Sequence, residues 1–169
     1  MIFALATPTG KAALAVFRIS GSGCHEVISK ILDKNIAEFN RVFLRKIIHD
    51  GVLVDVSTVV FYKSPKSYTG EDMVEIFCHG GFATLKKLIN LFHNLNIREA
   101  EPGEFTKIAV LNGKQTLNEA ESLLDLINST TDAEMNMALG VVAGELSNTV
   151  SVLGDELDDI RVFVESIID

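Results

Sequence analysis

Hydrophobic and polar positions in the first hundred residues follow the periods of short strands and helices. Apolar runs at residues 2–6 and 13–20 predict two strands, separated by the turn-forming stretch TPTGK. Residues 41–63 predict a β-hairpin, because Asp50-Gly51 stands between two runs rich in β-branched residues. A further strand is expected at 73–78 and a short one at 97–100.

Helical spacing occurs at three places in the same region. Apolar residues recur three or four positions apart in 23–32 and in 81–93, so each segment is expected to bury one face. A third helix is expected to begin near Gly103 and to end at Gly113, a residue type typical of a helix C-cap.

Beyond residue 116 the pattern is helical throughout. Thr116 with Glu119, and Thr131 with Glu134, have the spacing of capping boxes and predict two helix starts. Apolar residues then recur in steps of three and four from Met135 to Ile167, which predicts one long helix with a stutter in its heptads. The apolar stripe requires a partner surface.

These patterns predict an α+β domain over residues 1–115 and an all-α segment over 116–169. Charge supports the division: residues 1–115 carry 14 Lys/Arg and 11 Asp/Glu, whereas 116–169 carry Arg161 alone against 12 Asp/Glu. The acidic segment is a poor candidate for gripping nucleic acid. Two cysteines, no secretory signal and no membrane-length apolar run favour a cytoplasmic protein.

Two charged side chains interrupt apolar strand faces. Glu75 shares a face with Met73 and Phe77, and Arg18 shares one with Leu14 and Val16. In one interpretation the two form a buried ion pair, or Arg18 extends to the edge of the sheet. In the other they line a pocket and present complementary groups to a polar ligand. Lys114 is a candidate third member of such a pocket, unless it is an ordinary solvated turn lysine.

Other chemistry receives little support from the sequence. The dipeptides Cys24-His25 and Cys78-His79 lack the spacing of zinc ligands, so no metal site is predicted. Gly80-Gly81 permits a tight strand-to-helix turn whose free N–H groups could meet an anion. The motif G-x-x-x-x-G-K-[ST] of phosphate loops does not occur, and no Ser-His-Asp grouping can be assembled.

Four motifs occur in the order, and near the spacing, of one protein family. ATPTGKAALAVFRISGSG, SYTGEDMVEIFCHGG, PGEFTKIAVLNGK and NEAESLLDLINSTT resemble the N-terminal part of the MnmE (TrmE) family of tRNA modification GTPases, which act on the wobble uridine. The resemblance runs from Met1 to Asp169. Two departures are Lys11-Ala12-Ala13, where the family usually has Arg-Gly-Gly, and Ile108, where an arginine is common.

The resemblance implies a fold and a site. The expected N-terminal domain is similar to the folate-binding domain of aminomethyltransferases, binds 5-formyl-tetrahydrofolate and mediates homodimerisation. The family's folate-contacting residues match Arg18, Glu75 and Lys114. In this interpretation the Glu75 carboxylate accepts the adjacent N–H and amino group of the pterin, while Arg18 and Lys114 bind carbonyl or carboxylate oxygens.

The resemblance also implies a further domain and partner molecules for proteins of this family. GTP, Mg²⁺ and K⁺ belong to a GTPase domain that this sequence lacks, so no catalytic residue and no GTPase activity are expected here. Expected partners are a flavoprotein of the MnmG (GidA) type and tRNA, modified at C5 of the wobble uridine U34. The alternative is a non-catalytic assembly module in which the pocket is vestigial and Arg18 and Glu75 form a structural pair.

Overall fold

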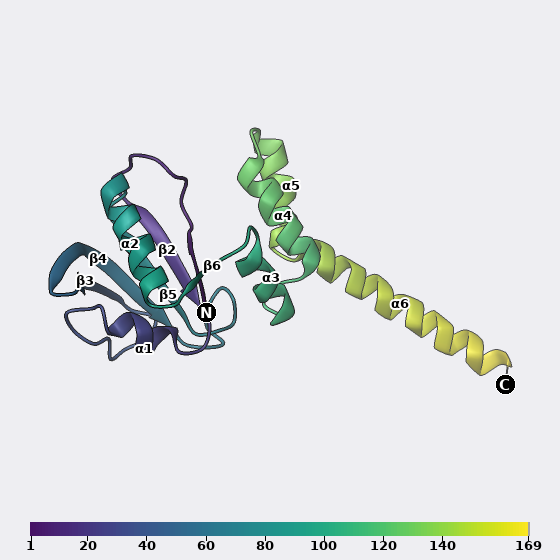
Figure 1. Ribbon diagram of the computed structural model, residues 1–169. Helices are drawn as coiled ribbons and strands as arrows, with labels where there is room; N and C mark the ends of the chain where they lie inside the picture. The colour runs from purple at the N-terminus through teal and green to yellow at the C-terminus, as the bar shows by residue number, and fades with distance from the viewer. Residues whose placement is uncertain (169) are drawn as a thin grey trace. The chain divides into compact units, whose positions relative to one another are not determined.

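A six-stranded mixed sheet forms the centre of the first structural unit, Met1–Lys114, in the computed structural model, which describes residues 1–168 (Figure 1). Its order is β3-β4-β5-β2-β1-β6, and all neighbours are antiparallel except β1 and β6. The strands are β1 (Ile2–Leu5), β2 (Ala15–Ser20), β3 (Val42–His49), β4 (Val52–Tyr62), β5 (Met73–Cys78) and β6 (Arg98–Glu99). The predicted strands are confirmed.

The turn between β3 and β4 forms as the sequence predicts. Asp50 and Gly51 both have positive φ, 49° and 75°, as a type I′ turn requires. The ladder shifts register between Ile47 and Ile48, where a bulge accommodates the connection.

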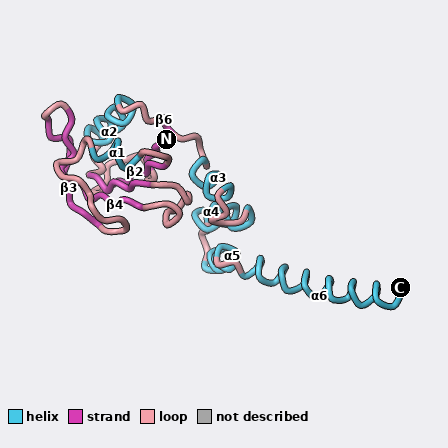
Figure 2. The backbone as a smooth tube through the Cα atoms, turned by 90° about the horizontal axis from the view of Figure 1, so that it is seen from below, coloured by secondary structure: helices cyan, strands magenta, loops and turns pink. Residues whose placement is uncertain are grey.

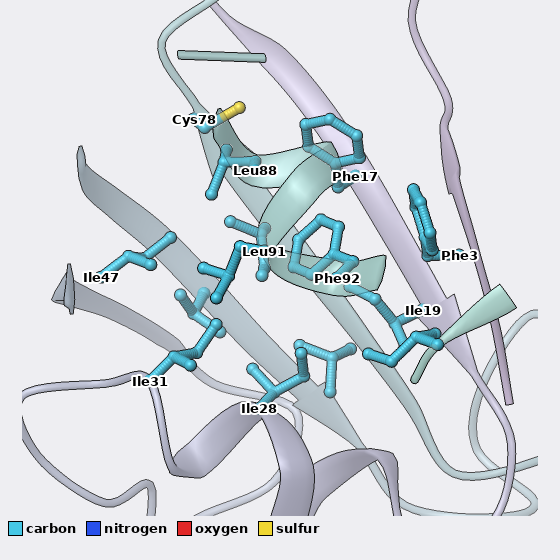
Figure 3. Close-up of a cluster of buried hydrophobic side chains, with 14 of the residues drawn as sticks. Phe3, Phe17, Ile19, Ile28, Ile31, Ile47, Cys78, Leu88, Leu91 and Phe92 are labelled. Carbon is cyan, nitrogen blue, oxygen red and sulfur yellow. The ribbon is translucent and has the colours of Figure 1, made fainter. Parts of the chain in front are cut away.

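Helices α1 (Cys24–Ser29) and α2 (Phe82–Asn94) contribute the apolar side chains that cover one face of this sheet. Figure 3 shows Phe3, Phe17 and Phe92 side by side between the strands and α2. The Phe92 ring lies 5.1 Å from that of Phe3 and 5.3 Å from that of Phe17, centroid to centroid. Each such side chain, when fully buried, contributes about 1.5–3 kcal/mol to folding.

A loop and a helix lie over part of the opposite face of the sheet, where Tyr68 and Phe105 contact Arg18 of β2. The loop comprises residues 63–72, and helix α3 (Glu104–Leu111) is followed by the turn that ends at Lys114. Two hydrogen bonds join loop and turn: the Asn112 side-chain amide donates to the Thr69 carbonyl at 2.7 Å, and Lys114 Nζ donates to the Pro65 carbonyl at 3.1 Å. Arg18 and Glu75, the two charged residues that interrupt apolar strand faces, lie on this face of the sheet.

The second unit, which starts at Gln115, consists of helices α4 (Leu117–Asn128), α5 (Asp132–Val142) and α6 (Glu145–Ile168) (Figure 2). Both predicted capping boxes form: Thr116 with Glu119, and Thr131 with Glu134. Up to residue 168 no strand occurs in this unit. An α+β domain followed by helices is therefore confirmed.

The single long helix predicted from Met135 to Ile167 is wrong. Helix α5 ends at Val142, and α6 begins at Glu145 after Gly144, whose φ of 81° lies in the left-handed region. Glycine adopts this conformation without the penalty that other residues incur, so the chain turns there.

The predicted apolar stripe of α6 is exposed along its length. Its members are between 44% and 67% exposed, and they are Leu146, Val150, Leu153, Leu157, Ile160, Val164 and Ile167. No single helix among the described residues is long and apolar enough to cross a membrane, whereas α5 and α6 together meet that test by length and composition, with a 51° bend between them.

Candidate functional site

Arg18 and Glu75 form an ion pair between adjacent strands. They are direct partners in the register of β2 and β5, and both point away from the apolar core because side chains alternate along a strand. Arg18 Nε and Nη2 donate to the same oxygen, Glu75 Oε1, at 2.9 and 2.8 Å. The side chains are 26% and 11% exposed. The ion pair that the first interpretation predicted is therefore present in the structure.

The second oxygen of Glu75 is bound by a residue that the sequence did not suggest. The hydroxyl of Tyr62, the last residue of β4, donates to Glu75 Oε2 at 3.0 Å. Burial, followed by the hydrogen bond and the charge of Glu75, raises the pKa of Tyr62 to about 12. The hydroxyl therefore keeps its proton at neutral pH and holds the carboxylate from the side opposite Arg18.

Aromatic rings hold the Arg18 guanidinium. Its Cζ lies 4.6 Å from the ring centroid of Tyr68 and 5.9 Å from that of Phe105. A cation over the face of an aromatic ring is attracted to it by the cation–π interaction. Glu75 receives two of the five N–H donors that a guanidinium offers, which leaves three for another acceptor.

The predicted site residues line two neighbouring cavities. Glu75 and Lys114 line one of about 370 Å³, together with Tyr62, Lys66, Ser67, Tyr68 and Met73. Arg18 lines a cavity of about 570 Å³ that also includes Phe105 and Thr106 of α3. The ion pair thus joins Arg18 to the first cavity, and the structure brings Arg18, Glu75 and Lys114 into one neighbourhood.

Four functional candidates were missed by sequence reasoning: Tyr62, Lys66, Tyr68 and Phe105. Tyr62 and Tyr68 flank the start of the motif that contains Glu75, and their side chains could have been suspected from that position. Phe105 carried no signal, because its contact with Arg18 depends on how α3 covers the sheet.

A second polar cluster lies at the other end of β4 and β5. His79 Nδ1 lies 2.7 Å from Asp55 Oδ1, and the His79 backbone N–H and the Ser57 hydroxyl donate to Asp55 Oδ2 at 3.0 and 2.9 Å. Burial opposes ionisation of the Asp55 carboxyl group, but the hydrogen bonds have the larger combined effect and hold its pKa below the ordinary value. The His79 side chain remains 65% exposed.

The Cys-His dipeptides form no cluster of metal ligands. Burial raises the pKa of Cys24 to about 12 and that of Cys78 to about 11, so both thiols stay protonated. His25 packs against the rings of Phe39 and Phe61, at 5.1 and 4.9 Å between centroids. Over residues 1–168 no group of three or more His, Cys, Asp or Glu side chains has a metal-binding arrangement.

Comparison with known proteins identifies the family. The family described as GTP-binding protein TrmE N-terminus matches residues 1–114, which include Arg18, Glu75 and Lys114. The chain belongs to the TrmE family. The resemblance carried by the four sequence motifs is thereby confirmed.

Curated relatives in the TrmE family carry the name tRNA modification GTPase MnmE. The protein from Thermotoga maritima is 46% identical over 164 residues, which is 94% of this chain and 36% of the relative. Those from Fervidobacterium nodosum and Aquifex aeolicus are 40% and 39% identical, over 99% and 98% of this chain and 38% and 37% of the relatives. The chain therefore spans well under half the length of these proteins.

Proposed function

We propose that this chain is the folate-binding and self-associating N-terminal part of a tRNA modification GTPase. The cavity between Glu75 and Lys114 is the proposed site for 5-formyl-tetrahydrofolate, and the domain is proposed to share the aminomethyltransferase-type folate-binding fold. The observation that carries the proposal is a carboxylate that is held by two different donors and still lines an open cavity.

The chemistry of the cavity suits a molecule with a hydrogen-bond-donating ring and an anionic tail. A carboxylate has about four acceptor positions, and Glu75 uses three, two on Oε1 and one on Oε2. One acceptor position therefore remains, which suits either the amino or the N–H group of a pterin, whereas the sequence interpretation expected the carboxylate to accept both. The ammonium groups of Lys66 and Lys114 line the same cavity and suit the carboxylates of the folate tail.

Arg18 contributes donors from the neighbouring cavity. Its remaining N–H groups suit a carbonyl or carboxylate oxygen of the same ligand. In this arrangement the ion pair is compatible with a ligand site, because it orients Arg18 and Glu75 toward the ligand. No catalytic residue is assigned within this chain.

A second candidate function is a non-catalytic assembly module. The Arg18–Glu75 contact neutralises both charges without any ligand, as a structural pair would. In addition, an apolar row on β3 and β4 faces away from the core: Val42 is 71% exposed, Leu44 67% and Val56 37%. Both functions are compatible with homodimerisation through this sheet.

Other properties of the whole protein are part of the same proposal. They are GTP hydrolysis with Mg²⁺ and K⁺ by a further domain, modification of tRNA at C5 of U34, cooperation with an MnmG-type flavoprotein and a cytoplasmic location. The name tRNA modification GTPase MnmE of the relatives supports GTP hydrolysis and tRNA modification, and two free buried cysteines suit a reducing compartment.

Calorimetric titration of the chain with 5-formyl-tetrahydrofolate tests the folate site. We expect saturable binding at one site per chain, and weaker binding of p-aminobenzoylglutamate, which lacks the pterin. A folded chain that releases no heat with millimolar ligand, or that binds both compounds equally, would overturn the proposal and favour the assembly module.

A further inference from the structure

We propose that Tyr68 is a positioning residue of the folate site, whose ring fixes the orientation of the Arg18 guanidinium. This inference rests on the proposed function for its link to a ligand, whereas the effect on Arg18 itself is independent of any ligand. The Tyr68 ring lies in the loop between β4 and β5, 4.6 Å from Arg18 Cζ.

The ion pair alone does not set the plane of the guanidinium. In a fork-to-fork pair, two parallel hydrogen bonds to two carboxylate oxygens fix the plane. Here Arg18 Nε and Nη2 converge on one oxygen, Glu75 Oε1, so the group retains freedom to turn about that atom. A ring that lies under the guanidinium restricts this freedom, because the cation prefers the face of the ring.

Tyr68 is itself held from several directions. Its hydroxyl lies 2.9 Å from Thr106 Oγ1 of α3. The next residue, Thr69, is fully buried, and its hydroxyl lies 2.7 Å from Ser20 Oγ of β2. The ring is therefore a fixed platform, and Phe105 approaches the same guanidinium at 5.9 Å.

The ring and the hydroxyl of Tyr68 have separable tasks, which provides matched variants. Tyr68→Phe keeps the ring and loses the bond to Thr106. Tyr68→Leu loses the ring, and Tyr68→Met is a second ring-less variant in case leucine impairs folding. Thr106→Val removes the same hydrogen bond as Tyr68→Phe from the other side.

Two measurements on the whole chain test the proposal. In NMR spectra without ligand, we expect the Arg18 Nη–H groups to give separate resonances in the wild type and in Tyr68→Phe, because rotation of the guanidinium is restricted, and to merge in the ring-less variants. In calorimetry with 5-formyl-tetrahydrofolate, we expect Tyr68→Phe and Thr106→Val to have similar affinities, and the ring-less variants to bind roughly three- to thirtyfold more weakly than Tyr68→Phe.

The outcomes separate this inference from the function on which it builds. An Arg18 resonance that is the same with and without the ring overturns the positioning role. So does an equal loss of affinity in Tyr68→Phe and Tyr68→Leu, because the hydroxyl would then account for the effect. If the wild-type chain does not bind the folate while the Arg18 resonance depends on the ring, the folate function fails and the positioning of Arg18 stands.

Discussion

Arg18 and Glu75 lie opposite each other on β2 and β5, and two nitrogen atoms of the arginine bind one oxygen of the glutamate. The other glutamate oxygen accepts a hydrogen bond from Tyr62. The carboxylate is therefore part of the structure of the sheet and, in the proposed function, part of a ligand site. A substitution of Glu75 therefore affects both the stability of the fold and the affinity for the ligand.

Glu75→Gln should weaken folate binding more than it weakens the fold. An amide keeps the size of the side chain but replaces an acceptor with a donor, and losing a charge-assisted hydrogen bond costs about 1.5–3 kcal/mol, roughly ten- to hundredfold in affinity. The stranded Arg18 is 26% exposed and keeps its aromatic contacts, so we expect unfolding to require only about 1–2 kcal/mol less.

Calorimetry and urea unfolding of the same variant give the two values. Arg18→Met with Glu75→Gln is the control, since the double variant leaves no unpaired charge and should recover stability without recovering affinity. A large loss of stability alongside intact affinity would show that the pair is only structural.

Lys114→Met should reduce affinity for the folate while sparing the fold. The Lys114 ammonium lines the cavity of Glu75 and makes one exposed hydrogen bond to the Pro65 carbonyl. Removing a cation that meets a ligand carboxylate costs about 1.5–3 kcal/mol, again roughly ten- to hundredfold. Lys63→Met is the matched control, because Lys63 pairs with Asp72 and should change affinity less than twofold. Equal effects of both substitutions would indicate general electrostatics and would remove Lys114 from the site.

Much of this site could be predicted from strand periodicity. The alternation of side chains along a strand places Glu75 and Arg18 on apolar faces, where an isolated charge is unusual. This prediction does not require the order of the strands in the sheet. Their direct pairing was not predictable, because β2 and β5 are separated in the chain by a hairpin and become neighbours only in the folded sheet. Tyr62, Tyr68 and Phe105 depend on the same tertiary contacts.

The break between α5 and α6 was not predictable for a different reason. An apolar stripe continues through Gly144, so its periodicity is the same on both sides of the turn. Gly140, Gly144 and Gly154 look alike in the sequence, but among these three Gly144 alone has a positive φ.

Gly144→Ala and Gly154→Ala should therefore have opposite effects. Alanine at position 144 must adopt a φ near 81°, which costs about 1–2 kcal/mol, whereas nothing lies within 4 Å of the Cβ position at Gly154 in the middle of α6. There alanine should stabilise the helix by about 0.5–1 kcal/mol. Thermal unfolding followed by circular dichroism measures both variants. A rise in the melting temperature of Gly144→Ala would show that the turn is not required.

Asp55→Asn should lower stability at neutral pH but not in acid. The folded-state pKa of Asp55 is depressed by its hydrogen bonds with His79 and Ser57, so its contribution is present above the unfolded pKa, near 3.8, and is lost as the pH falls through the folded value. We expect a difference of about 1–3 kcal/mol in unfolding free energy at pH 7 that shrinks below about pH 4. Urea unfolding across pH 3–7 measures it, with the exposed Asp50→Asn as the control. A difference that does not change with pH would contradict the ionised pairing.

Leu44→Lys should abolish self-association if the sheet face of β3 and β4 forms the contact between two copies. Leu44 is 67% exposed, and its neighbour Val42 on the same face of this edge strand is 71% exposed. Charged residues on an edge strand oppose pairing between chains, and a buried lysine without a partner is costly. We expect sedimentation of a dimer for the wild type at high micromolar concentration and of a monomer for Leu44→Lys. Leu111→Lys is the control, because Leu111 is 75% exposed but belongs to α3 and not to the apolar row of β3 and β4. A wild-type monomer at that concentration would refute self-association, and a dimeric Leu44→Lys would assign it to another surface.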